Sequence, residues 1–171
     1  FSSSLRAAAA KWFQEKQFPT HPRMPFCLVK WDDWISNIIL PEVAVYISDR
    51  SADAQQREVP FPLHKYLHHG MSSQAMVFNL IGPLITRNNY SPLVAVLKSK
   101  QVPGADDIAD AVFEYEDRNV FNEDTGQPTS IDIVLKNASG QPIIFIESKF
   151  DEKEFGGCSV FADGDCSGMN P

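Results

Sequence analysis

The run SIDIVLKNASGQPIIFIESKF (residues 130–150) constrains the fold more than any other part of the chain. Apolar side chains dominate on both sides of a short polar stretch, NASGQ, which has the composition of a tight turn. We therefore expect two antiparallel strands joined by a hairpin, with residues 139–140 as a two-residue loop. Residues 142–150 are apolar on both faces, which is typical of a strand inside a sheet.

This loop decides which residues face each other across the hairpin. Val134 faces Phe145, and Asp132 faces Glu147. Because side chains alternate along a strand, Asp132, Glu147 and Lys149 emerge on one face. Directly opposite Cβ atoms lie about 4.5–5.5 Å apart, so the two carboxylates can share one ion. A register slip of a single residue would separate them.

The two facing carboxylates need a compensating charge, because like charges opposite each other in a strand pair are unfavourable. Mg²⁺ would supply it, since this ion commonly takes one or two carboxylates together with water and phosphate oxygens. Lys149 lies two residues from Glu147 on the same face and can polarise a water or a phosphate. The hairpin therefore predicts hydrolysis of a phosphodiester. The alternative is a surface hairpin whose outer face carries Asp, Glu and Lys without a function.

The first half of the chain has helical periodicity. In residues 1–17, Ser4 is the expected N-cap of an amphipathic helix. The proline-rich residues 18–26 are expected to be extended or looped. Residues 31–39 carry apolar side chains at helical spacing, and Pro41 separates this helix from the next one.

A strongly apolar segment follows at residues 70–85. Ser72 or Ser73 is expected to cap a helix there. Its apolar stripe is expected to consist of Met76, Val77, Leu80, Ile81 and Leu84. A further short helix is expected in residues 91–100, opened by Pro92.

Strand patterns begin near residue 111. Val112, Glu114 and Glu116 alternate with Phe113 and Tyr115, so the two sets are expected on opposite faces of a strand. A turn-rich stretch then leads into the hairpin, which gives an antiparallel meander after a helical first half. This order of elements predicts an α+β fold.

The composition narrows the classes of protein. A hydrophobic content of 43% fits a globular chain, and no apolar run reaches the ~18 residues that a membrane span needs. Three cysteines give no disulfide framework and residues 1–17 do not read as a secretory signal, so we expect a cytoplasmic protein without membrane contact. A net charge of −7 disfavours non-specific coating of nucleic acid, but it leaves open an enzyme with an acidic site.

The order of Asp132, a hairpin and Glu147-Ser148-Lys149 resembles the PD-(D/E)xK superfamily of restriction-endonuclease-like nucleases. Their hallmark is an Asp on one strand, a hairpin, and Glu-x-Lys at the end of the next strand. The stretches HGMSSQAMVFNLIGPL, FEYED, TSIDIVL and IESKFDEKEFGGC also resemble a bacterial group of predicted restriction endonucleases. The resemblance implies an α/β sandwich-like α+β fold, with a restriction-endonuclease-like core of a mixed sheet containing an antiparallel β-meander. A helical N-terminal region precedes this core.

We expect one domain over residues 1–171. Within it, residues 1–67 would form a helical N-terminal extension and residues 68–158 the nuclease-like core. Residues 159–171 would form a loop. Because residues 151–171 are glycine-rich and lack periodicity, we expect the chain to be incomplete at its C-terminus.

The resemblance implies a metal-dependent nuclease, with DNA as the expected substrate. Asp132 and Glu147 would bind Mg²⁺, with Mn²⁺ as the alternative ion. Lys149 would assist the attacking water. A catalytically inactive member of the same fold that binds nucleic acid or a protein partner is the alternative, and an ordinary α+β interaction domain is a third interpretation. Cleavage specificity, the choice between DNA and RNA, the choice between endonuclease and exonuclease, and a homo-oligomer or protein partner are left open.

Many members of the superfamily add an acidic metal ligand from a preceding helix. The matching helix here offers Gln74 and Asn79, for which helix-to-loop hydrogen bonds are the first interpretation and support of the active site is the second. Glu114 and Glu116, on the strand before Asp132, are the available substitutes. We choose Glu114 as the third metal ligand because it lies deeper in the apolar alternation.

Other motifs are weaker. Residues 163–168 (DGDCSG) match the opening of a calcium loop, but a structural loop is favoured because the closing glutamate is missing. Cys158 and Cys166 lack a CxxC companion, which disfavours zinc. His64 and His68 are four residues apart and could share a helical face as ligands. A turn or surface position is the first interpretation for them, and a phosphate contact is the second.

Overall fold

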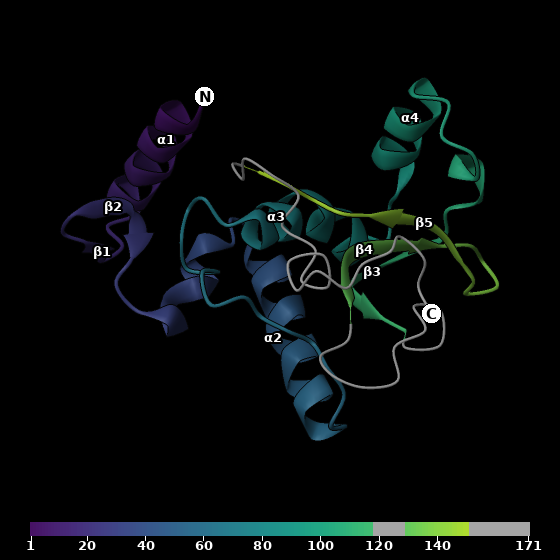
Figure 1. The fold of residues 1–171 in the computed structure, drawn as a ribbon, viewed down its shortest axis with the longest axis horizontal. Helices are drawn as coiled ribbons and strands as arrows, with labels where there is room; N and C mark the ends of the chain where they lie inside the picture. The colour runs from purple at the N-terminus through teal and green to yellow at the C-terminus, as the bar shows by residue number, and fades with distance from the viewer. Residues whose placement is uncertain (118–128, 151–171) are drawn as a thin grey trace, which may run out of the picture.

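The computed structural model describes residues 1–117 and 129–150. The helices in chain order are α1 (Ser2–Glu15), the 3₁₀ helix η1 (Trp31–Asn37), α2 (Pro41–Gln56), α3 (Ser73–Thr86), α4 (Ser91–Ser99) and the 3₁₀ helix η2 (Ala105–Asp107). The strands are β1 (Thr20–His21), β2 (Met24–Leu28), β3 (Asp110–Glu116), β4 (Ser130–Lys136) and β5 (Pro142–Ile146). Figure 1 shows their arrangement.

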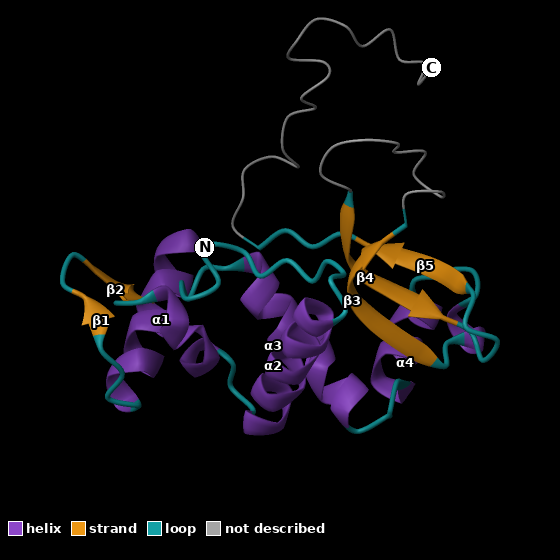
Figure 2. Ribbon diagram, turned by 90° about the horizontal axis from the view of Figure 1, so that it is seen from below, coloured by secondary structure: helices purple, strands orange, loops and turns teal. Residues whose placement is uncertain are grey.

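The strands form two separate sheets. One contains β1 and β2, and the other has the order β3-β4-β5. Figure 2 shows α2 and α3 in the middle, with the three-stranded sheet on one side and α1 with the small sheet on the other. The α+β class is therefore confirmed. Every strand pair in the described residues is antiparallel, so the parallel pairing expected for a mixed sheet is not found in this part of the chain.

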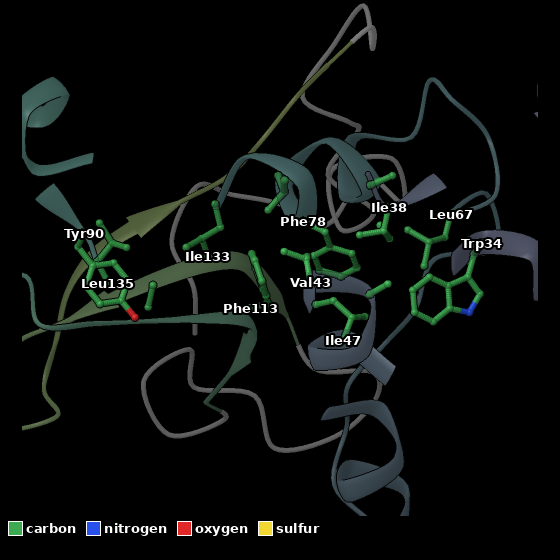
Figure 3. Packing of buried hydrophobic residues seen from close by; sticks show 14 residues of the cluster. Trp34, Ile38, Val43, Ile47, Leu67, Phe78, Tyr90, Phe113, Ile133 and Leu135 are labelled. Carbon is green, nitrogen blue, oxygen red and sulfur yellow. The ribbon is translucent and has the colours of Figure 1, made fainter. Parts of the chain in front are cut away.

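The core joins α2 and α3 to the face of the three-stranded sheet, as Figure 3 shows. Phe78 of α3 is fully buried and meets Phe113 of β3 edge to face, with ring centroids 4.9 Å apart. Truncation of such a ring to alanine typically costs about 3–5 kcal/mol. Gly82 lets α3 approach α2 closely, because a Cβ at this position would overlap the Val43 side chain.

The core takes residues from both sides of position 67. Trp34, Val43 and Ile47 belong to the predicted N-terminal extension, and all three pack in one cluster with Phe113 and other residues of the predicted core. The division at residue 67 therefore does not follow a gap in packing, and the domain boundaries stay a prediction. No helix in the described ranges is long and apolar enough to cross a membrane.

The helix ends near the N-terminus differ in detail from the expectations. Helix α1 begins at Ser2 with Phe1 as its N-cap, and the Leu5 amide donates to the Phe1 carbonyl at 3.1 Å. The predicted cap Ser4 is therefore wrong, because it lies inside the first turn. Residues 20–28 form a small hairpin, which the proline content alone does not reveal. Its end is anchored by Cys27 and Leu28, which are both buried.

Helix α3 confirms the predicted cap and the predicted stripe except at Leu80, since Val77 is in the core and Met76, Ile81 and Leu84 pack against it. The Ser72 hydroxyl accepts from the Ala75 amide at 3.2 Å. Leu80 is 63% exposed, whereas Phe78, outside the predicted stripe, is fully buried. The small residues Ala75 and Gly82 bring the packed side of the helix close to its neighbours, which hydropathy alone does not predict. Helix α4, with Pro92 in its first turn, is confirmed.

The register of the β4–β5 hairpin is confirmed. Val134 pairs with Phe145, and Ile133 pairs with Ile146. The predicted position of the second strand inside the sheet is wrong for the described residues, because β5 is an edge strand and Phe145 is 46% exposed. The inner strand is β4, whose three consecutive residues Ile133, Val134 and Leu135 are all buried.

The turn of this hairpin is not the predicted two-residue loop. The Gly140 amide donates to the Asn137 carbonyl at 2.9 Å, and the Asn137 amide donates to the Gln141 carbonyl at 3.0 Å. The loop therefore comprises residues 138–140, and Gly140 supplies the positive φ of 79° that such a loop requires. A register irregularity next to Lys136, which pairs with Pro142, restores the predicted pairing beyond it.

Candidate active site

The register of β3 against β4 places Glu114 opposite Asp132. Phe113 pairs with Ile133, and Tyr115 pairs with Ile131, so the residues between these pairs face each other. Glu114 has a φ of 50°, in the left-handed region that a residue with a side chain rarely adopts. Such a conformation costs about 1–3 kcal/mol, and strained residues cluster at functional sites. Gln17, Glu58, Asn88 and Gln101 also have a positive φ, so this angle alone does not single out Glu114.

Two consecutive side chains of β3 contact the same helix. Phe113 packs on Phe78 of α3, and the Glu114 carboxylate accepts a hydrogen bond from Gln74 of α3. The simple alternation predicted for this strand therefore does not describe its contacts at Glu114. The positive φ coincides with this departure from a regular strand.

The Gln74 side chain connects Glu114 to the segment that precedes α3. Its Nε2 donates to Glu114 Oε1 at 2.6 Å and to the Pro62 carbonyl at 2.8 Å. Its Oε1 accepts from the His64 amide at 2.8 Å. Ser130 donates from its hydroxyl to the other Glu114 oxygen, Oε2, at 2.8 Å. Gln74 therefore makes the helix-to-loop bonds of its first interpretation and also bonds to a candidate site residue, while its support of an active site stays a prediction.

Asn79, in contrast, has only main-chain partners among its hydrogen bonds. Its Oδ1 accepts from the Ile39 amide at 2.7 Å, and its Nδ2 donates to the Asn37 carbonyl at 3.0 Å. Asn79 therefore makes the helix-to-loop bonds that were its first interpretation.

Burial raises the pKa of the Glu114 carboxyl to about 7. The hydrogen bonds from Gln74 and Ser130 oppose this rise, because they stabilise the carboxylate. The negative charges of Asp132 and Glu147 add to it. Glu114 therefore titrates near neutral pH, as catalytic and ligand carboxyls often do.

A cavity of about 330 Å³ lies at this end of the sheet. It is lined by Pro62, His64, Ser73, Gln74, Glu114, Asp132 and Lys149. Ser73 and Gln74 are the first two residues of α3, so the positive end of the helix dipole also faces the cavity. The structure thus brings together three of the four predicted site residues, namely Glu114, Asp132 and Lys149.

The fourth residue, Glu147, lies beside this cavity but does not line it. The β4–β5 ladder ends at the pair of Ile133 and Ile146, one residue before Asp132 and Glu147. The Ser148 amide donates to Asp132 Oδ2 at 2.6 Å. Lys149 Nζ bonds to Glu147 Oε1 at 2.9 Å, and 44% of the Glu147 side chain is exposed. This ion pair is consistent with the prediction that Glu147 and Lys149 share a face.

A comparison with protein-family models gives one match over residues 6–168, to the family described as restriction endonuclease associating with ARP. The chain belongs to this family. No curated protein and no solved structure gives a significant match. The resemblance to restriction-endonuclease-like proteins, noted on the hairpin motif, is therefore confirmed over nearly the whole chain.

For this restriction-endonuclease-like chain, the metal ligands remain a prediction. The described residues contain no group of three or more His, Cys, Asp or Glu side chains arranged to hold a metal ion. Glu116, the alternative third ligand, lines a second depression, which Arg50, Lys136 and Glu114 itself also line, but it does not line the cavity that contains Asp132. Glu114 is thus the better placed of the two, because it shares a cavity with Asp132.

Sequence reasoning did not find the position of His64. Residues 65–68 form turns, so the helical face proposed for His64 and His68 is wrong. His64 lines the cavity through contacts distant in sequence, which no local signal indicates. Cys158, Cys166 and residues 163–168 lie outside the described residues. Burial raises the pKa of the Cys27 thiol, which makes this cysteine a packing residue.

Proposed function

We propose that this protein is a metal-dependent nuclease that hydrolyses phosphodiester bonds in DNA. One observation carries the proposal: Glu114 of β3, Asp132 of β4 and Lys149, which follows β5, line one cavity with two carboxylates and an ammonium group. Membership of a restriction-endonuclease-like family supports a nucleic acid as the substrate.

The residues at the cavity fit a divalent cation. Mg²⁺ needs only one or two protein carboxylates when phosphate and water supply the rest, and Glu114 and Asp132 provide two. A cation there would also offset the burial that raises the pKa of Glu114. Glu114, Asp132 and Glu147 would hold Mg²⁺ or Mn²⁺. The ion, when bound, polarises a phosphoryl oxygen and lowers the pKa of a water.

The chain's own groups position the substrate and stabilise charge. Lys149 brings a positive charge to the cavity, and its ion pair with Glu147 holds Nζ on that side of the hairpin. It would stabilise the negative charge that develops on the phosphate and help to generate the attacking hydroxide. The N-terminus of α3, at Ser73, favours a phosphate in the same space. Gln74 and Ser130 fix the Glu114 carboxylate.

The alternative is a member of the same fold that binds nucleic acid or a protein without cleaving. It is favoured by the position of Glu147 outside the cavity and by the net charge of −7. The family description names an association with ARP, and on that ground we include a protein partner in this alternative.

Cleavage assays separate these two functions. Plasmid and single-stranded DNA are incubated with the protein in Mg²⁺, in Mn²⁺ and in EDTA, alongside Asp132→Asn and Lys149→Met. We expect cleavage that needs a metal and that falls about a hundredfold or more in either variant, as when one charge-stabilising group is lost. Asp49→Asn and Lys11→Met, two changes at exposed positions on α2 and α1, are the matched controls.

The same assays can overturn the nuclease. Equal cleavage by all five proteins would identify a contaminant. DNA binding by the parent without any cleavage would favour the binding module. Circular dichroism spectra that match the parent would show that the variants are folded.

A further inference from the structure

Next to the cavity, the connection between α2 and α3 carries a row of rings. We call His64, Tyr66, His68 and His69 the ring cluster. The ring centroids of His64 and Tyr66 are 5.3 Å apart, and those of Tyr66 and His69 are 5.0 Å apart. His68 and His69 follow at 4.3 Å. Tyr66 is 47% exposed and His64 is exposed too, whereas His68 and His69 are half-buried.

An indole and an ammonium group extend the ring cluster. Trp31 is 40% exposed, and its Nε1 donates to the His64 carbonyl at 3.2 Å. Lys65 places Nζ 4.8 Å from the centroid of the Tyr66 ring. Exposed tryptophan and tyrosine beside a lysine are the side chains with which proteins stack nucleobases and contact the adjoining phosphates.

The connection has an irregular course, which the loop beside α2 in Figure 1 shows in outline. Leu67, in the middle of the ring cluster, is fully buried. Asn37 Nδ2 donates to the carbonyls of Leu67 and His69, both at 2.8 Å. Because the backbone is already fixed, a ligand that stacks on the rings loses little binding free energy to ordering this segment.

The ring cluster is continuous with the cavity. His64 belongs to both, because it lines the cavity and lies against Tyr66. A strand whose phosphate enters the cavity would therefore have an adjoining nucleoside at the ring cluster. The exposed rings thus have a defined occupant if the cavity binds a phosphodiester.

We propose that the ring cluster, with Trp31 and Lys65, binds an unpaired nucleobase next to the phosphate in the cavity, so that the substrate is single-stranded or unpaired nucleic acid. A base can stack on a protein ring only when its face is free, which a continuous duplex does not allow. The net charge of −7 also disfavours a wide contact with duplex phosphates. The substrate class proposed here rests on the proposed nuclease function.

Binding measured without cleavage tests the proposal. A short fluorescein-labelled single strand and its blunt duplex are titrated with the full chain in EDTA, and fluorescence anisotropy gives each Kd. We expect the parent to bind the single strand more tightly than the duplex. Tyr66→Ala should weaken single-strand binding about tenfold, as loss of one stacking ring typically does. Tyr66→Phe should stay within about twofold, because it keeps the ring.

Phe1→Ala removes an aromatic ring that is 84% exposed at the N-terminus, and it should bind like the parent. Unchanged spectra for Tyr66→Ala would show that the fold is intact. Equal single-strand binding by Tyr66→Ala and the parent would overturn the proposal, as would duplex binding as tight as single-strand binding. No nucleic-acid binding by the parent would overturn it as well, and would assign the rings to a protein partner.

The two proposals fail in different ways. Cleavage by the parent together with unchanged binding by Tyr66→Ala would reject the ring cluster and keep the nuclease. Binding that depends on the Tyr66 ring, without cleavage in any metal, would keep the base site and reject the nuclease.

Discussion

Gln74 and Asn37 do the same mechanical task at two places on the connection between α2 and α3. Each is a buried amide that bonds to main-chain atoms of that connection. Gln74 bonds to Pro62 and His64, and Asn37 bonds to Leu67 and His69. The two amides therefore hold the ring cluster from both sides.

The two amides differ in one partner. Asn37 exchanges side-chain hydrogen bonds with main-chain groups alone, whereas Gln74 also donates to the carboxylate of Glu114. A neutral amide bond gives structure that is independent of pH, but a bond to a buried carboxylate depends on its protonation. The same hydrogen-bond chemistry thus stabilises the fold at one place and prepares a titratable site at the other.

Glu114→Gln should have the largest effect, because it removes the negative charge of the carboxylate to which Gln74 donates. The folded pKa of about 7 lies above the usual value, so the folded state binds this proton more tightly than the unfolded state. Stability of the metal-free parent should therefore fall as pH rises from about 4.5 through 7, by on the order of 3 kcal/mol. In Glu114→Gln this fall should disappear, and cleavage should drop about a hundredfold.

Urea unfolding in EDTA at several pH values checks the stability, and Glu116→Gln on the same strand is the control. Added Mg²⁺ should stabilise the parent at pH 8 and the variant much less, since bound ligand stabilises the folded state. If Glu114→Gln loses stability with pH as the parent does, another group titrates.

Asn37→Ala should have the next largest effect, and this effect should be on the free energy of unfolding alone. It leaves the buried Leu67 carbonyl without its side-chain donor, which should cost about 2 kcal/mol. The His69 carbonyl loses one donor but still accepts from the Ser72 amide at 2.9 Å. Cleavage per folded molecule should stay within about twofold of the parent. Chemical denaturation measures the loss, with the exposed amide change Gln56→Ala as the control. A large loss of cleavage at unchanged stability would give Asn37 a role in the site and erase the contrast with Gln74.

Ser130→Ala should have a smaller effect with a defined sign. Its hydroxyl stabilises the Glu114 carboxylate, so its loss should raise the pKa of Glu114 further. The acidic limb of the pH–rate profile should move to higher pH, and stability at pH 8 should fall by about 1 kcal/mol. Ser3→Ala, an exposed change on α1, should leave the profile in place. A shift of the limb to lower pH would contradict the assigned direction of this hydrogen bond.

The smallest effect concerns the independence of the two amides. The side-chain hydrogen bonds of Asn37 and Gln74 go to different groups, so the stability losses of Asn37→Ala and Gln74→Ala should add within about 0.5 kcal/mol. Gln74→Ala with Glu114→Ala is the contrasting pair, because their side chains are joined by a hydrogen bond and the two losses should not add. Strong coupling between Asn37 and Gln74 would show that the whole connection orders as one unit.

The local pattern predicts some parts of this fold well. The alternation of apolar residues sets the register of the hairpin, and Val134 does pair with Phe145. The turn type was missed because Asn137 arranges it: its Oδ1 accepts from the amides of Ser139 and Gln141. The loop has one residue more than predicted, and the register shift next to Lys136 compensates for it. The predicted register is therefore correct although the predicted loop is not.

The candidate site shows where such reasoning ends. Asp132, Glu147 and Lys149 lie on one hairpin, so spacing along the chain was enough to group them. The bond between Gln74 and Glu114 joins residues that are 40 positions apart, and the positive φ of Glu114 has no composition signal. His64, which lines the cavity, is likewise bonded through its amide to Gln74, ten positions away. Tertiary contacts of this kind are absent from any local window of sequence.

Gly70 is the residue through which the N-terminal segment contacts the connection between α2 and α3. A side chain at this position would strike Ala9 of α1 and press on the carbonyl of Phe26, so the end of the connection lies directly on α1 and β2. The Gly70 amide also donates to that carbonyl at 2.8 Å. Helix α1 and the small sheet therefore support the end of the connection by direct contact. A substitution as small as Gly70→Ala would displace the backbone here. Through the neighbouring His69, the displacement would reach the ring cluster and then His64 at the cavity.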